Sequence, residues 1–246
     1  MRTLVAGLLT PLSLAEKSSG AQLLDLLIQT APDLSPEFYG NFEPVRTPFR
    51  SIGEVSWKPP FLWKRTAGVR ADGAVWFANP DNHSATYLRI TGRRQPTDQV
   101  VAFVQASAVA LSLDFAYVHL MTEKETKAPR ISYDMWYPID IGVTSSDLRK
   151  GIPNVCWAMV LGPPYVRMIG RERLLSAPCF AVRELSDEHL YLQLTAKVED
   201  VQEDFEEFDE LRQKLKAHLG ESVFLALNAA HAARAVPAFT YISAVP

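Results

Sequence analysis

The chain has 246 residues, of which 48 % are hydrophobic and 22 % charged, as in an ordinary soluble globular protein. This apolar content excludes disorder for the bulk of the chain, because enough surface can be buried to offset the entropy lost on folding. The 25 basic and 28 acidic residues give a net charge of −3, so we expect no nucleic acid as a partner. Two cysteines cannot form a disulfide framework and fit a reducing compartment, and we therefore expect a cytoplasmic protein.

The N-terminal apolar segment is predicted to form a first strand, from Thr3 to Leu9. The apolar run from Leu4 to Leu14 is broken by Pro11, and a membrane-spanning helix needs roughly 20 apolar residues. We therefore expect no membrane partner. The same run could serve as the core of a secretory leader, so a periplasmic protein remains an alternative to the cytoplasmic one.

The rest of the first half alternates between helical and strand-like patterns. A helix is expected where leucines recur at helical spacing between candidate serine caps, Ser18 and Ser19, and a terminating proline, Pro32. Five prolines predict an extended, largely irregular segment after it. The expected elements are helix Ala21–Thr30, irregular segment Pro36–Pro60, hairpin strands Val75–Ala78 and Ala85–Thr91, helix Thr97–Leu111 and strand Asp114–Met121.

The second half shows a similar order of elements without a sequence repeat. A polar run, Thr144–Gly151, is the natural boundary, giving a single α+β domain over residues 1–246 with halves 1–146 and 147–246. The expected fold is α+β, with an antiparallel sheet and helices packed on one face. The expected elements are strand Val155–Leu161, a break at Gly162–Pro164, helix Tyr165–Leu175, hairpin strands Phe180–Glu184 and His189–Leu194, helix Asp200–Leu219 and an extended C-terminal arm after a short helix.

The motifs that usually identify an enzyme are missing from the sequence. It contains no glycine-rich phosphate or dinucleotide loop, no Gly-x-Ser-x-Gly turn and no His-Glu-x-x-His pair. His83 lies in a turn-like sequence and is expected in a solvated loop, and His119 is expected to be a half-exposed structural residue on a strand. Cys156 and Cys179 are flanked by apolar residues and are expected in the core. We therefore expect no catalytic residue, cofactor or metal, and no enzymatic activity.

The most conspicuous feature is an acidic segment on the last predicted helix. Residues 199–210 contain eight acids and no base. Val201, Phe205, Phe208, Leu211, Leu215 and Leu219 form one apolar stripe at helical spacing. The opposite side carries an acidic ridge, made of Glu203, Glu206, Glu207 and Glu210. One explanation is a solvated helix face with acids placed near the positive end of the helix dipole. The other is a binding surface for a basic partner, because the dipole effect fades beyond the first turn.

A second feature is the clustering of aromatic residues. Trp57, Phe61, Trp63, Trp76 and Phe77 lie near the prolines, and Tyr133, Trp136 and Tyr137 lie in the central connection. Most large aromatics are packed in cores, whereas exposed loop aromatics act as interface anchors. Basic residues among the first group could suggest stacking on single-stranded nucleic acid, but the net charge argues against it.

Several segments together resemble a known group of bacterial proteins. They are Tyr39–Arg46, Phe61–Arg65, Asp114–Leu120, Gly151–Tyr165, Arg171–Pro178, Tyr191–Thr195 and Lys216–Gly220, of which the run around Trp157 and Leu161–Tyr165 is the most telling. Over roughly residues 36 to 224 the chain resembles immunity proteins of type VI secretion and polymorphic toxin systems, in particular the immunity protein 52 group.

This resemblance implies an inhibitor that binds a cognate secreted toxin, often a nuclease of the restriction-endonuclease fold, and blocks it without turnover. It carries no catalytic position to this sequence. We therefore expect a stoichiometric protein–protein inhibitor, with the acidic ridge as its contact surface and a homodimer left open. The alternative is a small cytoplasmic enzyme with an unrecognised Cys/His or carboxylate site, which a deep pocket joining such a group to a histidine would reveal.

Overall fold

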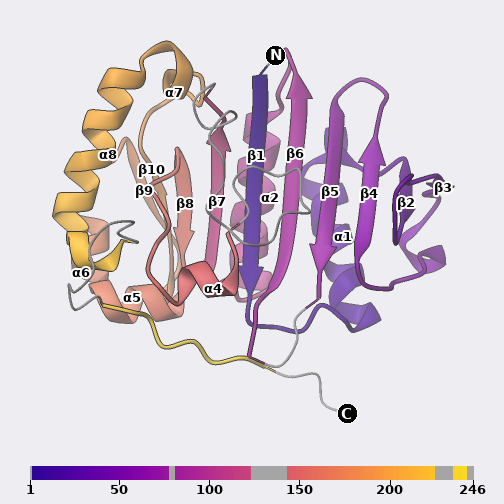
Figure 1. Ribbon diagram of the computed structural model, residues 1–246, viewed down its shortest axis with the longest axis horizontal. Helices are drawn as coiled ribbons and strands as arrows, with labels where there is room; N and C mark the ends of the chain where they lie inside the picture. Colours follow the sequence, from indigo (N-terminus) through magenta and orange to yellow (C-terminus); the bar gives the residue numbers. More distant parts are fainter. Residues whose placement is uncertain (1, 78–80, 123–142, 225–234, 243–246) are drawn as a thin grey trace.

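The fold is that of a computed structural model, which describes residues 2–77, 81–122, 143–224 and 235–242 (Figure 1). Ten strands form one antiparallel sheet in the order β3-β2-β4-β5-β6-β1-β7-β8-β10-β9. The strands are β1 (Arg2–Thr10), β2 (Phe38–Gly40), β3 (Thr47–Pro48), β4 (Phe61–Arg65), β5 (Arg70–Trp76), β6 (Ser84–Gly92), β7 (Phe115–Leu120), β8 (Ala158–Leu161), β9 (Ala181–Ser186) and β10 (His189–Gln193). The predicted α+β class with an antiparallel sheet is confirmed.

The first half builds its sheet from two crossover connections. The helix α1 (Lys17–Thr30) lies on the connection from β1 to β5, which also contains β2, β3 and β4. The helix α2 (Thr97–Ala110) leads from β6 to β7. Because β6 pairs antiparallel with both β1 and β5, the strands β1 and β5 are parallel to each other. The order β5-β6-β1-β7 is thus that of the split β-α-β-β-α-β motif.

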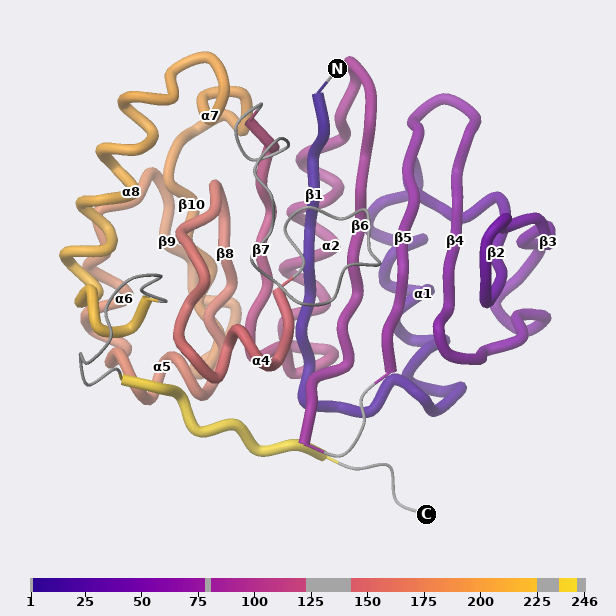
Figure 2. Tube along the Cα trace, viewed as in Figure 1, coloured from indigo at the N-terminus to yellow at the C-terminus, as the bar shows by residue number. Residues whose placement is uncertain are grey.

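The second half repeats this order of elements on the other side of β7. The short helices α5 (Pro163–Ile169) and α6 (Arg171–Leu175) follow β8, and α7 (Asp200–Glu203) and α8 (Phe205–Leu219) follow the β9–β10 hairpin. Here β10 lies between β8 and β9, as β6 lies between β1 and β5. Since β7 pairs with both β1 and β8, the sheet runs without interruption from one half to the other, as the Cα trace also shows (Figure 2).

The two halves place their main helices on opposite faces of the shared sheet. The helices α1 and α2 lie behind the sheet in Figure 1, on what we call the α2 face. On the other face, the α8 face, the ring of Phe115 lies 5.9 Å from that of Tyr165 on α5, and the ring of His119 lies 5.9 Å from that of Phe208 on α8. β1 and β8 are parallel, because both pair antiparallel with β7, and their crossovers to β5 and β9 run in opposite directions along the sheet. Right-handed crossovers of this kind must lie on opposite faces. Each half therefore has helices on one face, but the molecule as a whole has them on both.

The central strands are buried on both faces. Every residue of β7 is buried, and β1 is buried from Leu4 to Thr10. A close approach fixes their packing: a Cβ atom on Gly7 would lie 2.4 Å from Cε1 of Tyr117, its partner in register. Only a residue without a side chain leaves room for that ring. Among the described residues, no helix combines the length and apolarity needed to cross a membrane.

Several predicted boundaries are wrong, and backbone chemistry explains them. α1 begins at Lys17, and neither predicted serine cap is used, since its N-cap is Glu16. Pro163 and Pro164, predicted to break the chain, occupy the first turn of α5, where a missing backbone N–H costs nothing. The predicted helix Tyr165–Leu175 is divided at Gly170, which has a φ of 96°.

The proline-rich segment, predicted to be extended and largely irregular, includes two short strands at the edge of the sheet. It contributes β2 and β3, and β4 follows it directly. The aromatic residues near it are packed as predicted: Phe61 and Trp63 are buried, and the ring of Trp57 lies 4.6 Å from that of Phe61. Tyr133, Trp136 and Tyr137 and the predicted C-terminal short helix lie outside or largely outside the described residues. The extended arm is present, since Ile242 pairs with Leu12.

Candidate functional site

The acidic ridge lies at the surface, but on two helices rather than one. The chain leaves helical geometry at Asp204 (φ −137°, ψ 54°), so Glu203 ends α7, whereas Glu206, Glu207 and Glu210 belong to α8. All four glutamates are exposed. The opposite side is apolar as predicted, with Val201, Phe208, Leu215 and Leu219 buried and Phe205 and Leu211 half-buried.

The interruption has a cause in the docking of α7. Gln202 donates a side-chain hydrogen bond to the carbonyl oxygen of Met121 (2.6 Å), just past the end of β7. The adjacent Glu203 is ion-paired with Arg2 at the start of β1. These contacts hold α7 at the ends of the central strands, and the chain turns at Asp204 before α8 packs Phe208 onto the sheet.

The new helix start changes the electrostatic interpretation of the ridge. Glu206 and Glu207 lie in the first turn of α8, where the helix dipole favours negative charge. The argument that they lie too far from a helix start is therefore wrong for these two residues. It still holds for Glu210, which is ion-paired with Lys214 at 3.5 Å. Within the described part of the chain, Glu206 and Glu207 have no ion pair, so the ridge presents uncompensated negative charge at a position the helix itself tolerates.

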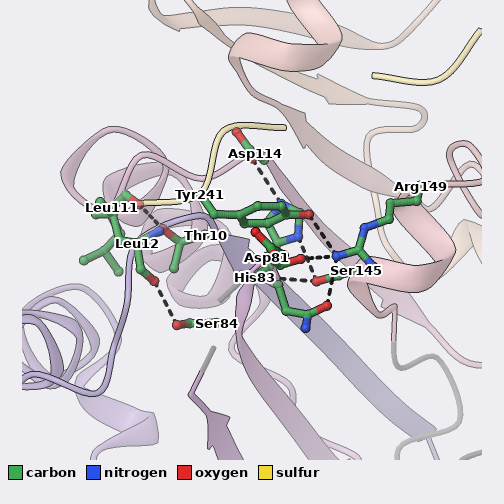
Figure 3. Close-up of polar contacts among 11 residues, drawn as sticks. Thr10, Leu12, Asp81, His83, Ser84, Leu111, Asp114, Ser145, Arg149 and Tyr241 are labelled. Atoms are coloured by element: carbon green, nitrogen blue, oxygen red, sulfur yellow. Dashed lines mark hydrogen bonds and ion pairs between the residues drawn. The ribbon is translucent and has the colours of Figure 1, made fainter. Parts of the chain in front are cut away.

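A polar cluster that sequence patterns do not reveal is shown in Figure 3. It lies at the ends of the central strands opposite to those that contact α7. His83 is buried, so its predicted solvated environment is wrong. Its Nδ1 lies 2.9 Å from Oγ of Ser145, and its Nε2 lies 3.1 Å from Oδ2 of Asp114. His83 directly precedes β6, Ser145 begins the short helix α4 (Ser145–Leu148), and Asp114 directly precedes β7. The cluster therefore ties together three segments that are far apart in the sequence.

The cluster has the composition of a hydrolase triad but is enclosed. The backbone N–H of His83 donates to Oγ of Ser145 (2.7 Å), which uses a lone pair of that oxygen. The rings of Phe239 and Tyr241 lie edge-on to the imidazole, at 4.8 and 5.0 Å. The side chain of His83 is 0 % exposed. His83, Asp114 and Ser145 are all buried, so the cluster joins the three segments inside the fold.

His119 and the two cysteines are also in packed positions. His119 is buried rather than half-exposed, and its Nδ1 accepts the backbone N–H of Trp157 at 3.1 Å. Cys156 is buried as predicted, and Cys179 is half-buried. Burial raises the pKa of the Cys179 thiol to about 12, which keeps it protonated and poorly nucleophilic near neutral pH.

The open part of the α8 face carries a third group of polar residues. Among the described helices, none covers β2, β4 and β5 on this face (Figure 1). A shallow hollow of about 400 Å³ lies there, lined by Lys64, Arg65, Thr66, Arg70, Ala71, Asp72 and Thr91. Asp72 is held by two hydrogen bonds from Arg89, at 3.0 and 3.2 Å. The hollow therefore has an excess of positive charge.

Comparison with known proteins gives a fold likeness without a family. No known family model and no curated protein matches the sequence. Among solved structures, the fold is similar to that of "Pseudomonas aeruginosa T6SS protein PA0821", with a TM-score of 0.52 and 13 % identity. The similar region covers 92 % of this chain and 77 % of that protein. At this identity the likeness shows the fold alone.

Proposed function

We propose that this protein is an immunity-type protein of a type VI secretion or related toxin system, which neutralises a cognate toxin by stoichiometric binding. The observation that carries the proposal is the likeness in fold to a T6SS protein across 92 % of the chain. Because no family model matches the sequence, the finer assignment to immunity proteins rests on the segments that resemble them. We further propose that the protein acts in the cytoplasm, where its two free cysteines are stable.

The acidic ridge supplies the proposed contact surface. Glu206, Glu207 and Glu210 are exposed on a helix whose other side is fixed by buried Phe208 and Leu215. A row of carboxylates on a fixed helix is complementary to a basic phosphate-binding surface, such as that of a nuclease toxin. Because the helix dipole stabilises two of these acids, the protein can present them with little cost in folding stability.

Inhibition without turnover is supported by the placement of the groups that could act in catalysis. The cluster of Asp114, His83 and Ser145 is enclosed by Phe239 and Tyr241. The alternative, a small enzyme, requires a pocket that opens onto such a cluster. We therefore expect the purified protein to show no nuclease or esterase activity above background, and activity lost on changing one residue would contradict this.

Co-purification and cell protection test the proposal. An inactive form of the toxin encoded next to this gene should co-purify with the protein at a 1:1 ratio, and the protein should protect cells from the active toxin. Replacing Glu206, Glu207 and Glu210 with lysine should slow association, reduce its salt dependence and weaken protection. The matched control replaces three other exposed acids, Glu16, Asp25 and Glu172, with lysine. Equal affinity of both triple variants would show that the ridge is only a solvated surface.

A further inference from the structure

The C-terminal arm, residues 235–242, is attached to the rest of the molecule by few contacts. It runs across the end of the sheet opposite α7 (Figure 1). Among the described residues, its one backbone hydrogen bond to the body runs from the N–H of Ile242 to the carbonyl oxygen of Pro11, at 3.0 Å. Segments with so few backbone hydrogen bonds open locally at a lower free energy than the core.

Two aromatic side chains make the main contacts of the arm. Its side chains alternate between the body and solvent, in the order buried Pro237, exposed Ala238, half-buried Phe239, exposed Thr240, half-buried Tyr241 and exposed Ile242. The rings of Phe239 and Tyr241 lie edge-on to the imidazole of His83, at 4.8 and 5.0 Å. The hydroxyl oxygen of Tyr241 also accepts a long hydrogen bond from Nη2 of Arg149, at 3.5 Å.

The polar cluster beneath the arm needs none of the arm's groups for its hydrogen bonds. The ring nitrogens of His83 face Oγ of Ser145 and Oδ2 of Asp114, and its backbone N–H donates to the same Oγ. All of these groups belong to the body of the molecule. The body can therefore keep the cluster intact when the arm is detached.

The hydroxyl of Tyr165 on α5 gives the closed arm a cost. The ring of Tyr165 lies 6.0 Å from that of Phe239, and its side chain is buried. Within the part of the chain that the structure describes, its Oη has no hydrogen-bond partner. Burial, and next the carboxylate of Asp114, raises the pKa of Tyr165, so the hydroxyl keeps its proton. A buried donor without an acceptor costs free energy that access to water would recover.

We propose that the C-terminal arm is a strap that opens and closes over the Asp114–His83–Ser145 cluster while the rest of the molecule stays folded. In the closed state the two aromatic rings of the arm cover His83. In the open state water reaches His83 and the hydroxyl of Tyr165. This opening does not depend on binding at the acidic ridge, because the arm contacts the residues after β1 whereas α7 contacts the start of β1.

Chemical labelling of the histidines in the full chain tests this proposal. Diethyl pyrocarbonate modifies imidazole rings that solvent reaches, and peptide mass spectrometry measures the adduct at each histidine separately. His119 is the internal control, because it is buried against Phe208 on α8 and not beneath the arm. His83 should be labelled faster than His119. Its rate should change little with urea below the unfolding transition, because a local opening exposes little surface.

Substitutions in the arm and at Tyr165 should change the labelling of His83 in opposite directions. Phe239→Ala should speed it about tenfold or more, because the arm loses a large apolar contact. Tyr165→Phe should slow it about fivefold or more, because closing the arm then leaves no hydroxyl without a partner. Val236→Ala is the matched control on the same arm, since Val236 is 47 % exposed, and should leave the rate unchanged. None of these variants should alter the labelling of His119.

Two results would overturn the proposal. The first is labelling of His83 at the rate of His119 and with the same urea dependence, because the arm would then open only on global unfolding. The second is an unchanged rate in Phe239→Ala. If that variant also lowers the urea midpoint, Ile242→Pro decides between the outcomes. It removes the N–H that donates to Pro11 at a residue whose side chain is 53 % exposed, and it should also speed the labelling of His83.

Discussion

Individual residues set the packing of the central strands, and Gly7 is the clearest example. Its partner in register on β7 is Tyr117, whose ring occupies the space that a side chain would need. We predict that Gly7→Ala lowers the free energy of unfolding by about 1–3 kcal/mol, as overpacking of a core does. Urea unfolding measures this, with Gly53→Ala as the control, since no atom lies within 4 Å of a Cβ at Gly53. Equal midpoints for the two variants would contradict the packing described above.

Phe208 contributes to folding stability because its side chain fills space in the core, whereas at Gly7 the absence of a side chain matters. Its side chain is buried, in contact with the ring of His119 on the α8 face. We predict that Phe208→Ala costs about 3–5 kcal/mol, as large buried aromatics do. Phe180→Ala is the matched control, because Phe180 is 62 % exposed and its removal should leave the unfolding midpoint nearly unchanged.

Glu37 links stability to pH through the β4–β5 hairpin. Its carboxylate accepts hydrogen bonds from the backbone N–H and the hydroxyl of Thr66, both at 2.9 Å, and from the N–H of Ala67. The Thr66 backbone bond, above all, lowers the pKa of Glu37 below its usual 4.5. The carboxylate therefore stabilises the fold above about pH 4.5, and this contribution is lost as the pH falls through the lowered pKa.

Glu37→Gln should therefore destabilise the protein at pH 7 and make its stability less sensitive to acid than that of the wild type. Urea midpoints measured at pH 7 and at pH 3.5 give the difference in stability. The lower pH is about one unit below the usual glutamate pKa. Glu172→Gln, at an exposed position, should follow the wild type at both values. An unaltered pH dependence in Glu37→Gln would show that the hairpin does not depend on this carboxylate.

The burial of a residue could be predicted from the sequence where it follows from the periodicity of one helix or strand. The buried stripe with Phe208 follows from spacing along one helix. The burial of His83 does not, because its partners Asp114 and Ser145 lie 31 and 62 positions away and its own neighbours have a turn-like composition. Long-range polar partners leave no periodic signal in a single sequence, and so the enclosed cluster was found only in the structure.

At the scale of elements, the sequence predicts the strands and helices of regular pattern to within a few residues, but it does not predict where the last helix is divided. β6, α2 and β10 lie close to their predicted ranges. The division of the last helix at Asp204 has no counterpart in the apolar pattern, which continues through it without a change in spacing. It depends on the docking of α7 against Arg2 and Met121, which are distant in sequence.

The division of that helix makes a specific electrostatic prediction. If α8 begins at Phe205, Glu206→Gln and Glu207→Gln should each cost about 0.3–1 kcal/mol, because they remove negative charge from its first turn. Glu210→Gln lies beyond that turn and should cost less than either. Urea unfolding at low ionic strength measures the three variants. Equal costs at all three positions would indicate one uninterrupted helix from Asp200.

At the scale of the whole molecule, the continuous sheet predicts a single unfolding unit. β7 pairs with β1 on one side and β8 on the other, so neither half can lose its strands without exposing the buried side chains of β7. Urea transitions followed by circular dichroism and by tryptophan fluorescence should coincide. Gly7→Ala in the first half and Phe208→Ala in the second should each shift both signals together, and separate transitions would show that the halves unfold independently.

The end of the sheet at β9 has a consequence for the protein at high concentration. Arg183 and Glu184 lie exposed at the centre of this edge strand, on alternate faces. Suppose that two copies pair antiparallel through β9, related by a two-fold axis normal to the sheet. Each residue of β9 then lies opposite a residue whose side chain is on the same face of the sheet. The central pair is then Arg183 with Arg183 or Glu184 with Glu184, and like charges directly opposite are destabilising. The edge therefore discourages the sheet from growing into aggregates by adding further copies of itself, while leaving its backbone groups able to accept a strand of different charge pattern.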